Sequence, residues 1–214
     1  MDRAIAEPEA LAASLYAAIE SRRSVRSYRP DPLPAALIER LLRAAGLAPS
    51  SHNRQPWRFV LVRDAATAAV LARAMGERLA EDRRRDGDAS DLIDRDVARS
   101  FARITGAPLL LLVCATLEEM DSYPDARRRE AERLMAVQST AMAAQNLMLA
   151  AAAEGVATCW MCAPLFCPET VRDTLALPPA WQPQGLITLG RAAAPARGRS
   201  RKALAEILVE RPLR

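Results

Sequence analysis

The order of apolar and polar positions predicts a chain in which helices alternate with a few short strands. Apolar residues at three- and four-residue spacing predict helices at about Glu9–Glu20, Pro34–Ala45, Asp64–Arg84, Ser90–Ile104, Asp125–Glu154 and Pro168–Leu175. Short apolar runs predict strands at about Trp57–Arg63, Pro108–Ala115, Val156–Met161 and Gly185–Gly190. This alternation favours one α+β or α/β domain.

Two of these segments are so apolar that the sequence also predicts how deeply they are buried. The run "PLLLLVCA" at 108–115 is continuously apolar, as expected for a strand buried on both faces. The long helix at 125–154 is apolar nearly all the way round from Leu134 to Ala153, and Gly155 ends it. We expect this helix to be central and partly covered by another subunit.

Length and composition set the remaining limits on organisation. The chain has 214 residues, half of them apolar, with no internal repeat, low-complexity linker or Gly/Ser hinge. We therefore expect a single domain over 1–214, with a basic and then amphipathic tail from about Ala192 that packs outside the core.

The sequence shows no targeting or membrane signal. The first residues mix both charge signs, and no window approaches the run of about 18 apolar residues that crosses a bilayer. We expect a soluble, cytoplasmic protein whose four cysteines are reduced.

The net charge of +4 comes mostly from arginine. The triple-arginine runs at 83–85 and 127–129 are flanked by acidic residues and have no aromatic neighbours for base stacking. Such interleaved charge is typical of solvated helix faces, so we expect no nucleic-acid partner.

Several kinds of catalytic site are missing. His52 is the only histidine, so a histidine-based metal site or a Ser-His-Asp triad would depend on it alone, and we expect no metal. No dinucleotide-binding G-x-G-x-x-G and no P-loop occurs. The pair Cys159 and Cys162 has redox spacing but lies in a strand pattern, which favours small buried apolar residues over a redox centre.

Anion-binding residues occur at both ends of the chain instead. "SRRSVRSYRP" follows the first helix, and "RGRSRKAL" follows the last strand. The candidates are Arg22, Arg23, Ser24 and Arg26 in the first cluster and Arg197, Arg199, Arg201 and Lys202 in the second. Together with the polar, proline-bounded crossing at 49–56, the two clusters suggest a phosphorylated cofactor.

These motifs, in this order, resemble the FMN-dependent nitroreductase family. "RRSVRSYRP", "LAPSSHNRQPWRFVLV", "GVATCWM" and the basic tail carry the resemblance over nearly the whole chain. "SYPDARRREAE" and the segment from Cys159 to Gly190 look closest to the flavin-binding C-terminal domain of the γ-glutamyl ligase that matures a deazaflavin coenzyme. The resemblance implies an α+β fold in α/β/α layers, with a central mixed sheet, helices on both faces and an intertwined homodimer.

The resemblance also implies an FMN site at each subunit interface. Arg22, Arg23 and Ser24 would approach the phosphate, Arg26 the pyrimidine edge of the flavin, and Arg199 and Arg201 would complete the phosphate site from the tail. The crossing would reach the flavin from the other subunit through Pro49, Ser50, Ser51 and Asn53. The backbone of Cys159, Trp160 and Met161 would pass near flavin N5.

The implied activity is hydride transfer from NAD(P)H through FMN to a small electron-poor acceptor. Flavin carries this chemistry, so no catalytic side chain is expected beyond electrostatic support from Arg26. His52 is either a substrate contact or a structural imidazole, and Tyr123 is a weaker candidate for the same pocket. The alternative function is a flavin- or deazaflavin-binding accessory protein, or one of deazaflavin-coenzyme biosynthesis, with little NAD(P)H turnover.

Some aromatic and polar residues have expected structural roles. Trp57, Trp160 and Trp181 are expected in the core or an interface rather than as stacking partners. Gln145 and Asn146 interrupt the apolar helix and need polar partners, which a dimer contact or the flavin neighbourhood could supply.

Overall fold

The computed structural model describes residues 7–196, 198 and 200–211. Its helices are α1 (Pro8–Ser21), α2 (Ala35–Gly46), α3 (Ala65–Arg85), α4 (Ser90–Thr105), α5 (Ala126–Ala153), α6 (Pro168–Thr174) and α7 (Leu204–Ile207). Its strands are β1 (Trp57–Val62), β2 (Leu109–Ala115), β3 (Ala157–Met161) and β4 (Gln182–Gly190). Two 3-10 turns, η1 (Ser51–Asn53) and η2 (Ala163–Phe166), complete the set. No helix of the described residues is long and apolar enough to cross a membrane.

The strands form one sheet in the order β1-β2-β4-β3. Every neighbouring pair of strands is antiparallel. The expectation of a mixed sheet is therefore wrong for these four strands. The only parallel pairing in the described chain is the isolated bridge between Ser24 and Thr158. All seven residues of β2 are buried, which confirms the expected strand covered on both faces.

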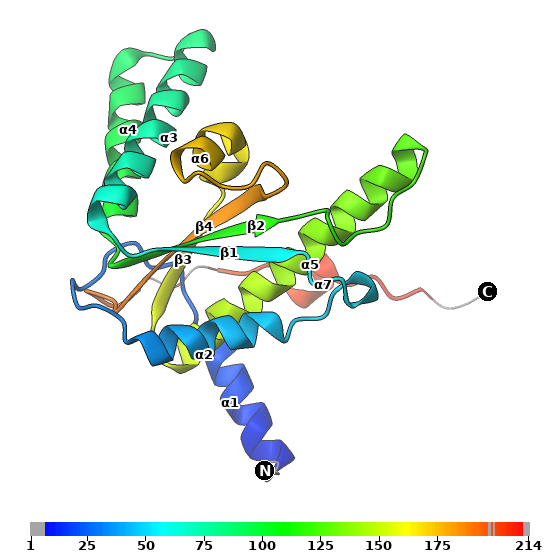
Figure 1. Cartoon of the computed structure of the whole chain (residues 1–214). Helices are drawn as coiled ribbons and strands as arrows, with labels where there is room; N and C mark the ends of the chain where they lie inside the picture. The colour runs from blue at the N-terminus through cyan, green and yellow to red at the C-terminus, as the bar shows by residue number, and fades with distance from the viewer. Residues whose placement is uncertain (1–6, 197, 199, 212–214) are drawn as a thin grey trace.

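Helices cover both faces of the sheet and give three layers (Figure 1). Alternate strand residues point into two separate apolar clusters. One cluster joins the sheet to α2 and α5, with Leu41, Leu111 and Leu147 at its centre. The other joins it to α3, α4 and α6 through residues such as Leu71 and Val171. The α/β/α layering is therefore as the resemblance implied.

Helix α5 buries one face in the single chain. Its buried positions, Glu132, Ala136, Ser139, Thr140, Ala143, Ala144, Leu147 and Ala151, recur at three- and four-residue spacing. Leu134 and Met142, on other faces, remain 46% and 40% exposed. The expectation of a helix buried all round is therefore not met within one chain.

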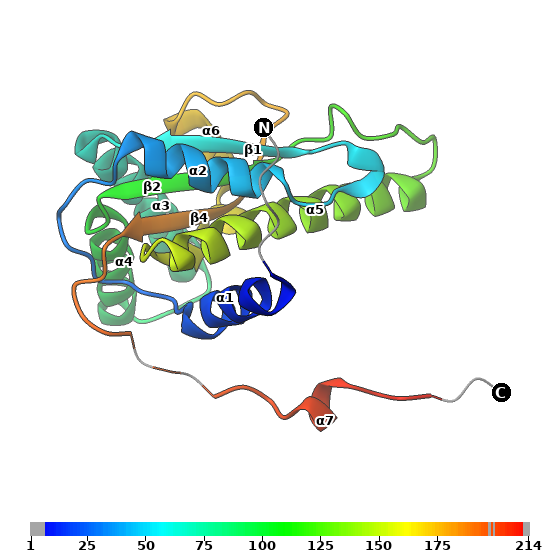
Figure 2. The same cartoon turned by 90° about the horizontal axis from the view of Figure 1, so that it is seen from below.

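Other apolar side chains are also exposed. On α1 they are Leu11, Leu15, Tyr16 and Ile19, and in the tail they are Leu204, Ile207, Leu208 and Val209. Figure 2 shows the tail running clear of the three layers. Exposed apolar side chains gathered on one segment are typical of an interaction surface.

The arginine runs behave as solvated helix faces. Arg83 pairs with Asp88 and Asp96, and Arg85 pairs with Asp82. In the second run Arg128 pairs with Asp125, which also caps the start of α5. The interpretation made from the interleaved charges is thus supported.

Candidate functional site

The segment after α1 runs along the edge of the sheet, and hydrogen bonds hold it there. The Val25 amide donates to the Thr158 carbonyl (3.0 Å), and the Arg29 amide donates to the Arg191 carbonyl (2.8 Å). Between them, the Tyr28 hydroxyl lies 2.6 Å from both the Val25 carbonyl and Thr188 Oγ1. Burial raises the pKa of this phenol far above its ordinary value, so Tyr28 remains a neutral hydrogen-bonding group. The basic segment 22–26 is therefore held in one place.

A cleft of about 540 Å³ opens beside this segment. Its walls are the ends of α1 and α5, the start of β3 and residues Ala192–Ala196 of the tail. Arg22 and Arg23 are the only charged side chains among the described residues that line it. Its volume lies in the range of small-molecule sites, and without a carboxylate it favours an anion.

Two helices end at this cleft, and their last carbonyl groups would repel an anion. Arg23 Nη1 donates to the carbonyls of Glu20 and Arg22 at the end of α1. Arg191 Nη1 donates to the Glu154 and Gly155 carbonyls after α5 (2.8 and 2.9 Å). Both C-termini are therefore neutralised by guanidinium groups.

Three further guanidinium interactions converge on β3. Burial raises the pKa of the Cys159 thiol, and the positive charges of Arg26, Arg103 and Arg22 oppose that rise. Within the described part of the chain, these three arginines make no side-chain hydrogen bond or ion pair. Their charge is thus available to a ligand at the edge of β3.

The crossing between α2 and β1 has a strained backbone. His52, Asn53 and Gln55 have φ of 48°, 54° and 49°, the left-handed region that L-residues avoid at a cost on the order of 1 kcal/mol each. Short-range hydrogen bonds close the turn, among them the Gln55 amide to Ser50 Oγ (3.1 Å). Strained conformations that the surrounding structure maintains are typical of ligand-binding segments.

The crossing and the cleft lie at different positions along α5. The Ser51 amide donates to Ser139 Oγ (3.3 Å), and Ser51 Oγ lies 3.2 Å from Met135 Sδ. The cleft instead touches Ala152. Ser139 and Ala152 are thirteen residues apart, which is about 20 Å along the helix.

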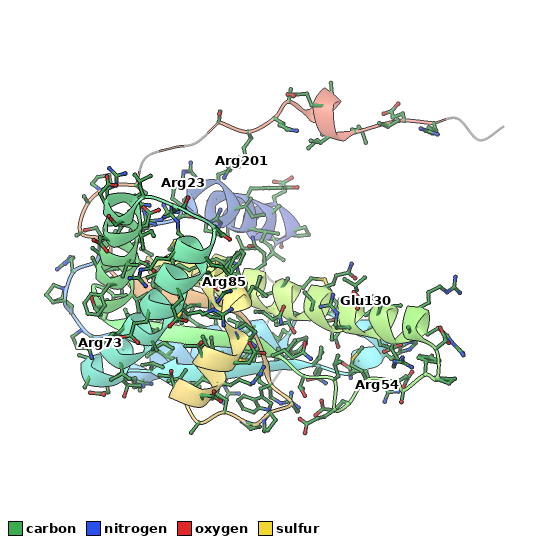
Figure 3. The ribbon with its side chains drawn as sticks, turned by 90° about the horizontal axis from the view of Figure 1, so that it is seen from above. Arg23, Arg54, Arg73, Arg85, Glu130 and Arg201 are labelled. Carbon is green, nitrogen blue, oxygen red and sulfur yellow. The ribbon has the colours of Figure 1, made fainter. Side chains whose placement is uncertain are left out.

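Figure 3 shows the same separation in the side chains: Arg23 lies on the side of the molecule where Arg201 extends from the tail, and Arg54 lies away from both. Arg201 is exposed, and its Nη1 donates to the Ser200 carbonyl (3.2 Å). Arg199, the other basic residue predicted for the phosphate site, lies outside the described residues, as does Arg197.

The profile of the nitroreductase family matches residues 19–191. The chain belongs to the nitroreductase family. An NADH dehydrogenase of Thermus thermophilus is 31% identical over 193 residues, covering 79% of this chain and 82% of the relative. The more specific resemblance to the deazaflavin-coenzyme ligase domain stays a prediction, because the family match does not separate the branches of the family.

Two solved nitroreductase structures share the fold over most of their length. A nitroreductase of Desulfovibrio desulfuricans, crystallised with FMN, has a TM-score of 0.73 and 26% identity, covering 98% of this chain and 99% of its own. The FMN-dependent nitroreductase NfnB of Mycobacterium smegmatis, in complex with NADPH, has a TM-score of 0.71 and 25% identity, covering 94% and 100%. The α+β nitroreductase fold predicted from the motifs is therefore confirmed.

The structure divides the site residues predicted from the nitroreductase motifs into two sets. Arg22, Arg23, Ser24 and Arg26 lie with Cys159, Trp160 and Met161, because segment 24–25 pairs with Thr158 of β3. Pro49, Ser50, Ser51 and Asn53 form the second set in the crossing. No backbone hydrogen bond joins the two sets within the described part of one chain.

Trp160 is fixed at the end of β3. Its indole Nε1 donates to Cys162 Sγ (3.1 Å), and its ring lies against Gly185 of β4. Trp57 is buried in the cluster under α2 and α5, and Trp181 packs against the other cluster. These positions agree with core roles for the tryptophans.

The remaining candidates divide in a similar way. His52 is exposed and makes no hydrogen bond within the described chain, so that chain gives it no structural partner. Tyr123 is half-buried with the Arg128 guanidinium 4.7 Å from its ring centre. Asn146 Nδ2 donates to the Ala44 carbonyl at the end of α2 (3.3 Å), whereas Gln145 is exposed. Asn146 therefore has a polar partner in α2 within the chain.

Two basic residues of the site could not be found from the sequence. Arg103 is an isolated arginine in the last turn of α4, and Arg191 directly follows β4. Neither belongs to a motif, and both act through contacts made by residues distant in the sequence. The pairing of Ala157 with Gly190 places Arg191 beside the end of α5, and Arg103 comes near Cys159 from α4.

Among the described residues, no group of three or more histidine, cysteine, aspartate or glutamate side chains could hold a metal ion. The four cysteines are free, and Cys114, Cys159 and Cys167 are buried. Cys162, just after β3, is exposed, which corrects the expectation that both members of the C-x-x-C pair are buried.

This difference predicts a selective thiol. Burial raises the pKa of Cys114 to about 12 and also raises those of Cys159 and Cys167, so their reactive thiolate forms are rare near neutral pH. We expect the flavin-free native protein to release one equivalent of thionitrobenzoate from Ellman's reagent rapidly, and four after denaturation. Cys162→Ser should remove the rapid phase, and several rapid equivalents would contradict the burial of the other three.

Proposed function

We propose that the protein is an FMN-dependent oxidoreductase that moves hydride from NAD(P)H through the flavin to a small electron-poor acceptor. The observation that carries the proposal is the carboxylate-free cleft with unpaired arginine charge, in a chain of the nitroreductase family. The FMN complex of the Desulfovibrio relative and the NADPH complex of NfnB support the two ligands.

The residues present fit the cofactor. Arg22, with Arg201 and Arg199 from the tail, would bind the doubly charged phosphate, for which guanidinium groups are suited. Arg23 and Arg191 would act indirectly, by neutralising the helix ends at the cleft. Ser24 would add a hydroxyl donor beside them.

Bound FMN supplies the hydride chemistry itself, so the chain needs to bind, orient and tune it. Arg26 and Arg103 would stabilise the negative charge that develops on the pyrimidine edge during reduction. The backbone of Cys159–Met161 would align along the ring, since Arg26 lies close to β3. His52, exposed on the crossing, is proposed as a substrate contact.

A homodimer accounts for the separation along α5. One subunit would supply the cleft and β3, and the second would supply Pro49, Ser50, Ser51 and Asn53. The exposed apolar residues of α1, α5 and the tail support such an interface, because a surface of this kind is costly to leave in water. The tail from 192 would complete the site.

The test begins with the purified protein. We expect a yellow protein that releases one FMN per chain on denaturation and oxidises NADH or NADPH when a quinone or nitroaromatic acceptor is present. FMN binding without turnover would instead favour the accessory role. A colourless protein that binds no added FMN would contradict both.

A further inference from the structure

Few hydrogen bonds other than that of Arg54 join the strained crossing at 50–55 to the rest of the chain: Ser51 bonds to Ser139 and Met135 of α5, and the Gln55 carbonyl accepts from Arg58 Nη1. Three hydrogen bonds from backbone amides close it on itself: Asn53 amide to Ser50 carbonyl (3.0 Å), Arg54 amide to Ser51 carbonyl (2.9 Å) and Gln55 amide to Ser50 Oγ (3.1 Å). These bonds shape the turn but do not fix it against the protein.

Among residues 52–55, one described side chain bonds outside the crossing. The side chains of Asn53 and Gln55 bond only to each other's residue, and His52 bonds to nothing described. Arg54 instead forms an ion pair and hydrogen bond with Asp121. The link spans 67 residues of sequence and joins the crossing to the loop before α5.

That loop is itself anchored to α5. The Asp121 amide donates to Glu132 Oε2 (3.3 Å), and Glu132 is a buried carboxylate, only 6% exposed. A buried carboxylate needs such a donor and cannot move freely. A second pair, Arg58 with Glu119, ties the start of β1 to the same loop. Arg54 and Asp121 thus add a second link from the crossing to α5, beside the direct bonds of Ser51 to Ser139 and Met135.

The solvent exposure of the Arg54–Asp121 pair indicates that it positions the crossing and contributes little to the stability of the whole fold. The side chains of Arg54 and Asp121 are 40% and 38% exposed, and ion pairs this exposed add little to global stability. The pair Arg40 and Glu154 is similar in chemistry but joins α2 to the residue that follows α5, away from the crossing. It therefore provides a matched control.

We propose that Arg54 and Asp121 form a positioning pair that holds the left-handed turn at His52, Asn53 and Gln55 so that Ser50, Ser51 and Asn53 meet the flavin already ordered. This inference rests on the proposed function for its purpose, although the holding itself is a property of the chain without cofactor. Preorganisation of this kind lowers the ordering cost of binding.

Hydrogen exchange of the flavin-free protein tests the holding directly. In Arg54→Ala and in Asp121→Asn, we expect the amides of residues 53–55 to exchange about 5-fold faster, while amides of β2 stay unchanged. Arg40→Ala should leave the exchange of the crossing at the wild-type rate. Unchanged exchange in both crossing variants would overturn the proposal.

FMN titration tests whether the Arg54–Asp121 pair assists flavin binding. Arg54→Ala should raise the Kd for FMN about 5-fold, and the exchanged pair Arg54→Asp with Asp121→Arg should recover most of that loss. If wild-type protein binds FMN and Arg54→Ala binds it equally well, the positioning role is wrong, whereas the proposed function is unaffected. If wild-type protein binds no FMN, the proposed function fails, and the exchange experiment still decides whether the pair holds the turn.

Discussion

Arg22→Ala combined with Arg201→Ala is expected to lose FMN during purification, with a Kd at least about 100-fold above that of the wild type. In the proposed site, each substitution would remove a charge-assisted hydrogen bond to phosphate, worth about 1.5–3 kcal/mol, and each 1.4 kcal/mol is a factor of ten in Kd. Arg22 is half-buried at the cleft and has no other described side-chain partner that would compensate. Equilibrium titration of the flavin-free variant with FMN, followed by flavin fluorescence, measures the effect.

The control for this prediction removes the same charge elsewhere. Arg73 and Arg84 are exposed arginines of α3, a helix that contributes no residue to the cleft, so Arg73→Ala with Arg84→Ala should bind FMN as the wild type does. Equal losses in the two double variants would mean that net charge, and not the cleft, governs retention. An unchanged Kd in the Arg22 and Arg201 variant would place the phosphate elsewhere.

Gly185→Ala is expected to destabilise the fold strongly. A Cβ at this position of β4 would lie 2.2 Å from a ring carbon of Trp160, so the indole must move. Overpacking of this severity costs about 3 kcal/mol, or about 10 °C in the melting temperature of a chain this long. The displaced indole should also lose its bond to Cys162 and alter tryptophan fluorescence.

Two further variants test whether the clash with Trp160 causes the loss of stability in Gly185→Ala. Gly46→Ala adds a Cβ with no atom within 4 Å, so it should leave the melting temperature nearly unchanged. Trp160→Leu in the Gly185→Ala background should recover part of the lost stability by making room. A Gly185→Ala protein as stable as the Gly46→Ala protein would refute the close packing of Trp160 on β4.

The helices could be predicted because their signals are local. Pro8 begins α1, Asp64 and Asp125 cap α3 and α5, and Gly155 follows the end of α5, all close to the predicted bounds. The strand β4 starts at Gln182, three residues before the predicted start at Gly185. The sequence predicts the later start because proline is unusual inside a strand, and Pro183 lies within this one. The irregular register between Val113 and Cys114 accommodates that proline.

Features that depend on distant contacts could not be predicted. Strand direction is not encoded within a strand, so the antiparallel sheet was missed. The left-handed residues of the crossing include no glycine, the usual signal for that conformation. The residues of the two basic clusters were found because the motifs are continuous, whereas Arg103 and the Arg54–Asp121 pair needed the fold.

The position of the cleft and the crossing at different places along α5 has a consequence for the protein in solution. When each cofactor is held by two chains, its retention follows mass action in the chains as well as in the cofactor. Dilution would then release flavin and separate subunits together, and FMN would in turn favour assembly.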